Sequence, residues 1–163
     1  MKAFLFAAFV TALFSFSLTS HATGNTQTSL QALKAKLARL GEPKIKGTEL
    51  VGGRTVPAIY FGKTKINNSY VTVDSIKKAN GGTATIFVKD GQEFVRVSTN
   101  VLTDDGTRAV GTNLARNKAY DTVSKGETFC GDVEIMGTPY DTCYEPIKSG
   151  TEVIGIYYVG FKK

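Results

Sequence analysis

The chain has 163 residues and a formal net charge of +6, with 42% hydrophobic and 21% charged residues, which suits one globular domain. The charge surplus mildly favours anionic partners. The basic residues are scattered, however, and no basic stripe alternates with aromatic residues, so nucleic-acid binding is not expected.

Residues 1–22 are typical of a secretory signal peptide. Lys2 supplies the positive start, residues 3–18 are mostly apolar, and Ser20-His21-Ala22 provides small residues for cleavage. An uncleaved anchor helix is the alternative, although the apolar run is short for a membrane span of about 20 residues. Cleavage would place the protein in the periplasm or outside the cell. It would also remove the only histidine, His21, and with it serine–histidine and cysteine–histidine pairs and histidine metal sites.

Residues 23–50 are expected to form a leader and an amphipathic helix. The helix is predicted from Ser29 to Leu40, because leucines recur there at three- and four-residue spacing. These are Leu30, Leu33, Leu37 and Leu40. Gly41 ends the helix, and residues 42–53 are predicted to be irregular. Such a short helix needs a sheet to cover its leucines.

Residues 51–163 are expected to form one domain, organised around a hairpin at residues 83–101. Asp90-Gly91 is a strong signal for a two-residue turn, which would set Phe87 opposite Phe94 and Thr85 opposite Arg96. The side chains then alternate between two faces. The aliphatic face carries Ala84, Ile86, Val88, Val95 and Val97, and the mixed face carries Thr83, Thr85, Phe87, Phe94, Arg96, Ser98 and Asn100.

Two further helices are predicted around this hairpin. One covers residues 69–79 with Val73 and Ile76 turned inward, and the other covers residues 112–125. The turn at residues 103–106 lacks the alternating oxygen ligands of a calcium loop, so no metal is expected there.

A second hairpin is predicted at residues 129–146, with its turn at Met136-Gly137. This register sets Cys130 opposite Cys143, inside the range of a disulfide bond, which would stabilise the fold by about 3 kcal/mol. A three-residue loop, which would make the two cysteines diagonal, and two free thiols remain alternatives. The face with Asp132, Glu134, Asp141 and Glu145 is expected to be solvated, so catalytic carboxylates are not expected. Residues 152–161 are apolar on both faces, as in a central strand.

Five segments give the chain a resemblance to the Cache 3/Cache 2 fusion family of extracellular sensor domains. They are VPAIYFG (56–62), TATIFVKDGQEFVRVSTNV (83–101), DGTRAVG (105–111), YEPI (144–147) and VIGIYYVG (153–160). The resemblance implies an α+β fold with a PAS-like antiparallel sheet of five strands, ordered 2-1-5-4-3 and flanked by an N-terminal helix and connecting helices. It also implies a pocket for a small molecule, often a carboxylate, on the sheet face away from that helix.

Domains of this family usually belong to chemoreceptors or sensor kinases. This chain shows no second membrane span and no cytoplasmic signalling region, so a free-standing periplasmic module is expected. A membrane receptor or sensor kinase is then its candidate partner, and no enzymatic activity or cofactor is expected.

The leading hypothesis is a ligand-binding module. Arg96 would clamp a carboxylate with two parallel hydrogen bonds. The remaining expected contacts are Tyr140, Tyr144, Thr85, Ser98 and Tyr60. For Arg96 the alternative is a surface arginine running past Phe94, and for the tyrosines it is ordinary core with the hydroxyl at the rim.

The second hypothesis is an interaction or scaffold protein whose pocket is vestigial. An open pocket beside Arg96 would favour binding, and a collapsed, dry interior would favour the scaffold. The sequence names no particular ligand.

Overall fold

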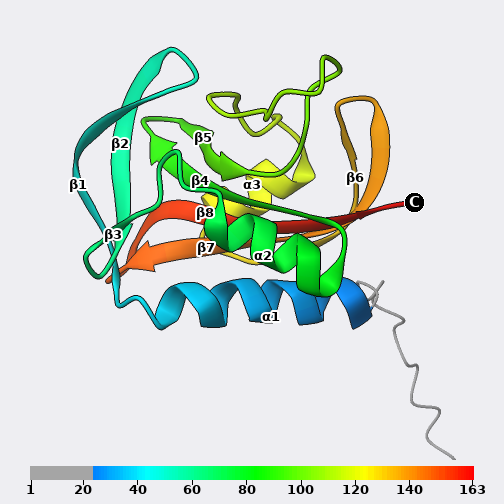
Figure 1. The fold of residues 1–163 in the computed structure, drawn as a ribbon, viewed down its shortest axis with the longest axis horizontal. Coiled ribbons are helices and arrows are strands. Elements are labelled where there is room, and N and C mark those ends of the chain that lie inside the picture. Colours follow the sequence, from blue (N-terminus) through cyan, green and yellow to red (C-terminus); the bar gives the residue numbers. More distant parts are fainter. Residues whose placement is uncertain (1–23) are drawn as a thin grey trace, which may run out of the picture.

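The computed structural model describes residues 24–163, which form two antiparallel sheets and three helices (Figure 1). The predicted signal peptide lies outside the described residues. The elements in chain order are α1 (Gly24–Ala38), β1 (Pro43–Val51), β2 (Arg54–Phe61), β3 (Thr64–Lys65), α2 (Val71–Asn80), β4 (Thr83–Asp90), β5 (Glu93–Thr99), α3 (Lys118–Ser124), β6 (Phe129–Ile135), β7 (Thr138–Ser149) and β8 (Glu152–Lys162).

The larger sheet has five strands in the order β5-β4-β8-β7-β6. The final strand, β8, lies between β4 and β7, as its apolar sequence predicted. If only the strands of this sheet are numbered, from β4 as 1 to β8 as 5, each strand has the neighbours that the predicted order 2-1-5-4-3 gives it. Numbered over the whole chain, that order does not hold, because the three strands of a second sheet come first.

The predicted turn of the first hairpin is wrong by one position. Asp90 pairs with Glu93, so Gly91 and Gln92 are the turn residues, and Phe87 lies opposite Arg96 instead of Phe94. Gly91 has φ of 60°, and Gly at the first central position with positive φ is the requirement of a type II′ turn. Moving the turn by one position shifts the partner of every β4 residue by two positions along β5. Each side chain therefore stays on the same face of the hairpin.

A β-bulge beyond this point changes the faces after all. The register shifts between Ile86 and Phe87, so Ile86 pairs with Ser98 and Thr85 pairs with Thr99. Ser98 therefore leaves the mixed face, and its hydroxyl donates to the Ser69 carbonyl at 2.5 Å. Thr99 takes its place, with its Oγ1 at 2.6 Å from that of Thr85.

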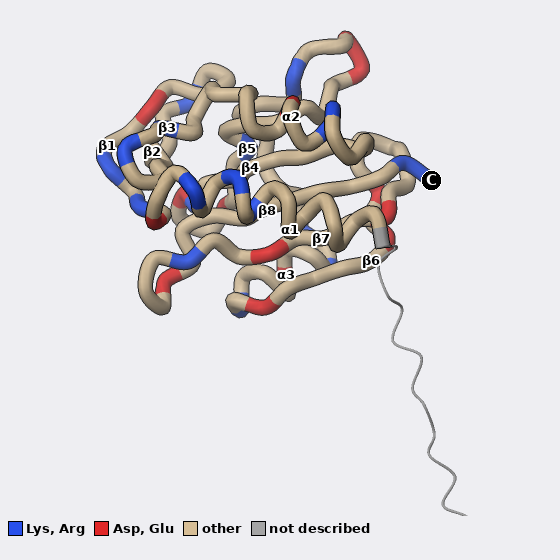
Figure 2. Tube along the Cα trace, turned by 60° about the horizontal axis from the view of Figure 1, so that its bottom comes forward, with Lys and Arg blue, Asp and Glu red and all other residues tan. Residues whose placement is uncertain are grey.

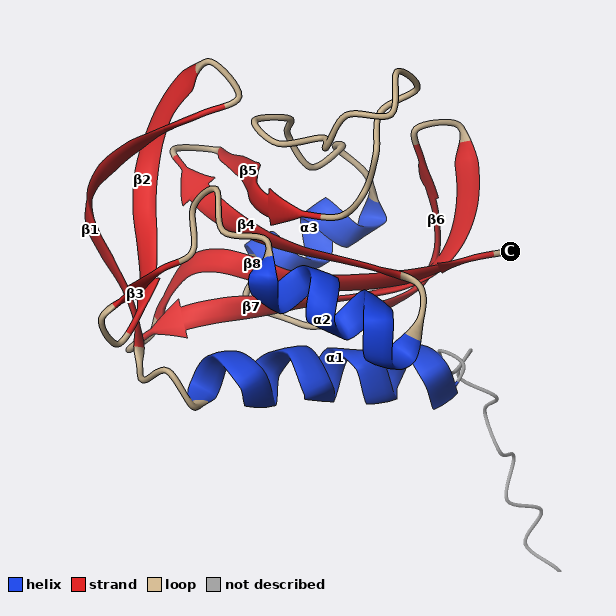
Figure 3. Cartoon of the chain, in the orientation of Figure 1, coloured by secondary structure: helices blue, strands red, loops and turns tan. Residues whose placement is uncertain are grey.

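The aliphatic face packs against α1 and α2, which lie together on one side of the five-stranded sheet (Figure 3). Leu33, Leu37 and Val73 are fully buried there, and Leu30 and Ile76 nearly so. The helix α1 begins at Gly24, so the predicted start at Ser29 was five residues too late. Leu40 lies beyond the end of α1 and is 39% exposed, which is also a correction.

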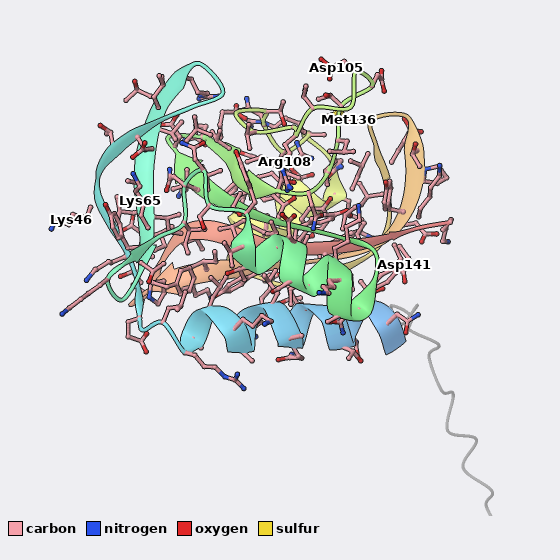
Figure 4. All side chains as sticks on the ribbon, viewed as in Figure 1. Lys46, Lys65, Asp105, Arg108, Met136 and Asp141 are labelled. Carbon is pink, nitrogen blue, oxygen red and sulfur yellow. A yellow bond between two sulfur atoms is a disulfide. The ribbon has the colours of Figure 1, made fainter. Side chains whose placement is uncertain are left out.

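The smaller sheet, in the order β1-β2-β3, was not predicted, since residues 42–53 were expected to be irregular. β1 is exposed over most of its length and shows no apolar alternation, so its sequence carries no strand signal. Basic residues gather on this sheet (Figure 2), and Figure 4 labels two of them, Lys46 and Lys65.

The second hairpin has the predicted register, including Ile135 opposite Thr138 and Val133 opposite Tyr140. Cys130 and Cys143 form a disulfide, with their Cα atoms 4.1 Å apart, so this prediction is confirmed.

The charged face of this hairpin is not fully solvated, contrary to expectation. Cys143 is fully buried and Asp141 is 8% exposed. The hydroxyl of Thr26 donates to Asp141 Oδ2 at 2.7 Å, and Lys34 Nζ donates to Glu145 Oε1 at 2.5 Å. The reason is α1, which extends far enough towards the N-terminus to cover this part of β7.

Candidate functional site

A small pocket lies on the mixed face, where two segments from different parts of the chain meet. One is residues 113–117, which precede α3, and the other is the end of β6 with its turn into β7, where Figure 4 labels Met136. The lining residues are Arg96, Asn113, Leu114, Ala115, Asn117, Val133, Glu134, Ile135, Met136 and Tyr144. The cavity volume is about 110 Å³, the space of roughly three to four water molecules.

Three other hollows are larger, at about 470, 560 and 270 Å³, the last of them beside α3 and β6. The first lies between the two sheets, and the second lies beside α1 and the disulfide. Their linings contain charged side chains, but none of these is buried. The small pocket is the candidate site because its lining includes a buried charge.

Arg96 on β5 supplies that charge and is 6% exposed. Its guanidinium carbon lies 5.0 Å from the centre of the Phe87 ring. Both hydrogen bonds that its side chain makes to described residues come from Nη1, to Thr112 Oγ1 at 2.8 Å and to the Asn113 carbonyl at 3.1 Å. The Nε atom is buried and has no partner among the described residues.

The ion pairs among the described residues do not include Arg96. Burial lowers the pKa of Arg96 below its ordinary value, but an arginine side chain stays protonated in proteins. A buried donor without a partner costs about 1–3 kcal/mol, and more when it is charged. An anion that accepted from this guanidinium would remove that cost.

Two tyrosines stand near Arg96. Burial raises the pKa of both Tyr144 and Tyr158 above the ordinary value of 10, so both phenols are neutral. The Tyr158 hydroxyl lies 3.0 Å from Thr83 Oγ1. Tyr144 contacts the rings of Phe129 and Tyr158 and makes no hydrogen bond to a described residue, so its hydroxyl can donate to a ligand.

Of the predicted ligand contacts, Arg96 and Tyr144 line the pocket together. Thr85 lies on the same face but is fully buried against Thr99. Tyr140 packs at the edge of the cluster of aromatic residues on this face. Ser98 lies on the opposite face, because of the bulge, and Tyr60 lies on β2, where it pairs with Lys44 and Lys65.

Sequence reasoning missed the contacts made by residues 111–114, because it assigned residues 112–125 to a helix. The helix α3 covers only Lys118–Ser124. Asn117 is its N-cap residue, and the Asn117 Oδ1 accepts from the amides of Ala119 and Tyr120. Asn is a preferred N-cap residue, so this position was a readable sign of the later start.

Residues 111–114 instead lie along the free edge of β5. The Arg96 amide donates to the Thr112 carbonyl at 2.9 Å, and the Leu114 amide donates to the Phe94 carbonyl at 2.8 Å.

Within residues 24–163, no cluster of three or more histidine, cysteine or acidic side chains could hold a metal ion. In the same range, no helix is both long and apolar enough to cross a membrane.

An antiparallel sheet with helices on one face and a pocket on the other is consistent with the class of Cache domains, which are extracellular small-molecule sensing modules. The chain matches the Cache 3/Cache 2 fusion domain over residues 15–163 and belongs to that family. Comparison with curated proteins found no match. Domains of this family are typically sensors and not enzymes.

Proposed function

We propose that this protein is an exported sensing module that binds a small anion, most simply a carboxylate, at Arg96. The observation that carries the proposal is the buried guanidinium, whose Nε has no partner and which forms no ion pair within residues 24–163. A carboxylate accepts two parallel hydrogen bonds from the edge of a guanidinium formed by Nε and Nη2. Nη1 is already occupied by Thr112 and Asn113, so the guanidinium donors left without a partner among the described residues are on that edge.

The cavity volume limits the ligand to a few non-hydrogen atoms, such as acetate or propionate. The Tyr144 hydroxyl is the second donor in reach, and the Phe87 ring beneath the guanidinium holds its plane. Export by residues 1–22 would place this pocket in the periplasm or outside the cell. A membrane receptor or sensor kinase would then read the bound state.

A scaffold protein with a vestigial pocket is the second candidate, and the small volume favours it. The two functions differ in whether an anion binds. Thermal unfolding of the mature protein should be measured with formate, acetate, propionate, pyruvate and phosphate, with chloride as the reference anion. One of the carboxylates is expected to raise the melting temperature in a saturable way.

Arg96→Lys keeps the charge and loses the two-donor edge, so it should remove this response. Arg116→Lys is the matched control, since Arg116 also lies over an aromatic ring, that of Tyr120 at 4.3 Å, but is on the surface. A response that survives in Arg96→Lys contradicts the assignment. If no anion in the panel binds the native protein, the scaffold function is favoured.

A further inference from the structure

The segment that holds Arg96 is shared with another part of the molecule. Residues 111–114 are attached to β5 through main-chain hydrogen bonds, including that from the Gly111 amide to the Arg96 carbonyl at 2.8 Å. Thr112 and Asn113 also accept from the Arg96 side chain. The position of the guanidinium therefore depends on where this segment lies.

The other side of the same segment contacts the tip of the β1–β2 hairpin. Arg54, the first residue of β2, donates from Nη1 to Asn113 Oδ1 and from Nη2 to Asp90 Oδ2, both at 2.8 Å. Asn113 thus accepts from Arg96 through its carbonyl and from Arg54 through its side chain. One residue joins the pocket to the smaller sheet.

Backbone contact reinforces this connection. A Cβ atom added to Gly52 would lie 2.5 Å from the Val110 carbonyl oxygen and 2.8 Å from the Gly111 Cα. No side chain therefore fits between these two segments of the backbone. Gly52 has φ of 54° and Gly111 has φ of 79°, values that favour glycine. Close backbone packing of this kind transmits a displacement of one segment directly to the other.

We propose that Arg54 is a positioning residue of the Arg96 pocket and that the β1–β2 hairpin is energetically coupled to it. This inference rests on the proposed function, because it gives that site its regulation. A ligand that accepts from Nε and Nη2 would displace the guanidinium. Because Nη1 donates to the Asn113 carbonyl and Arg54 donates to the Asn113 side chain, the displacement would reach Arg54 through Asn113. Coupling between two sites is reciprocal, so a change in the hairpin also alters ligand affinity.

The first test needs no ligand. Amide hydrogen exchange should be measured by NMR at Gly111 and Leu114 in the native protein, in Arg54→Ala and in Lys65→Ala. Lys65 is the matched control, because its ion pair with Glu49 lies within the smaller sheet. Arg54→Ala should speed exchange at both amides by about fivefold or more, the lower end of typical coupling, whereas Lys65→Ala should leave both unchanged.

Asn113→Ala is the second variant, since it removes the acceptor of Arg54 and keeps the carbonyl that serves Arg96. It should reproduce the part of the Arg54→Ala effect that passes through Asn113. The double variant should add little to Arg54→Ala alone, because Arg54→Ala already breaks the bond to Asn113, together with the ion pair to Asp90. Unchanged exchange in Arg54→Ala, or fully additive effects in the double variant, would overturn the inference.

The second test titrates acetate into the same variants by calorimetry. Arg54→Ala should weaken acetate binding by about fivefold or more, with Lys65→Ala equal to the native protein. Faster exchange together with unchanged acetate affinity would show that Arg54 does not position the site. Faster exchange in a protein that binds none of the anions would leave the coupling intact and remove the proposed function, so the two failures are distinguishable.

Discussion

The two faces of the five-stranded sheet are built for different purposes. Leucine, valine and isoleucine side chains fill the space between the aliphatic face and the helices α1 and α2, and charged groups lie at the margin of this face. The mixed face is covered by the short helix α3 and by loops, and it buries Arg96 beside a cavity. The first face carries the apolar burial that α1 and α2 need. The second holds a charge that has no ion-pair partner in the described part of the chain, and this costs stability. Under the proposed function this charge serves ligand binding, so mutations on the two faces should separate stability from ligand response.

The largest effect is expected on the aliphatic face. Leu33→Ala removes a fully buried side chain of α1 and should lower the free energy of unfolding by about 2–5 kcal/mol. Leu40→Ala, at a position that is 39% exposed, should change it by about 0.5 kcal/mol or less. Urea denaturation measures both values. Equal effects of the two variants would show that α1 does not cover the sheet as described.

The disulfide is the next test, because it joins β6 to β7, the two strands that carry Val133, Ile135 and Tyr144 of the pocket lining. Replacing Cys130 and Cys143 together by alanine should cost about 3 kcal/mol, given the 13-residue separation of the two cysteines. Intact mass after alkylation without reduction establishes the bond in the purified protein, and chemical denaturation gives its contribution. A double variant as stable as the native protein would show that neighbouring strands already fix the hairpin.

The smallest effect is expected in the loop at residues 103–107, far from both buried faces. Hydrogen bonds from Thr103 and Thr107 lower the pKa of Asp105 from 3.8 to about 2. A lowered folded-state pKa stabilises the fold above the unfolded value and loses that stabilisation as the pH falls from about 4 to 2. NMR titration of the Asp105 carboxyl measures this directly.

Asp105→Asn should reduce the dependence of the free energy of unfolding on pH between about 4 and 2, and Asp104→Asn is the control variant. A midpoint for Asp105 near 3.8 would mean that the threonine contacts do not persist in solution.

The sequence predicted the second hairpin well because its turn has a firm chemical requirement. Met136 and Gly137 both have positive φ, as the two central residues of a type I′ turn demand, and the cysteine pairing followed from that register. The first hairpin offered two competing turns, Asp90-Gly91 and Gly91-Gln92, that differ by one position. Its faces were predicted correctly up to the bulge, because the two registers have the same alternation.

The remaining differences come from tertiary contacts that no local pattern encodes. The bulge that turns Ser98 away from the mixed face is one example. The smaller sheet is another, since β1 is exposed and is held by pairing with β2. Residues 111–114 add to the edge of β5 through main-chain bonds, which leave little mark on side-chain type. The sequence thus indicated Arg96 and Tyr144 but not the segment that holds Arg96 in place.

The most direct test of anion binding observes Arg96 itself. In the NMR spectrum of the mature protein, the Nε–H signal of Arg96 can be assigned by its loss in Arg96→Lys and followed as acetate or propionate is added. We predict a saturable change in chemical shift and slower hydrogen exchange for Arg96 Nε–H, while the Nε–H of Arg116 stays unchanged. An Arg96 signal that does not move at any carboxylate concentration, in a protein whose fold is intact, would contradict the account.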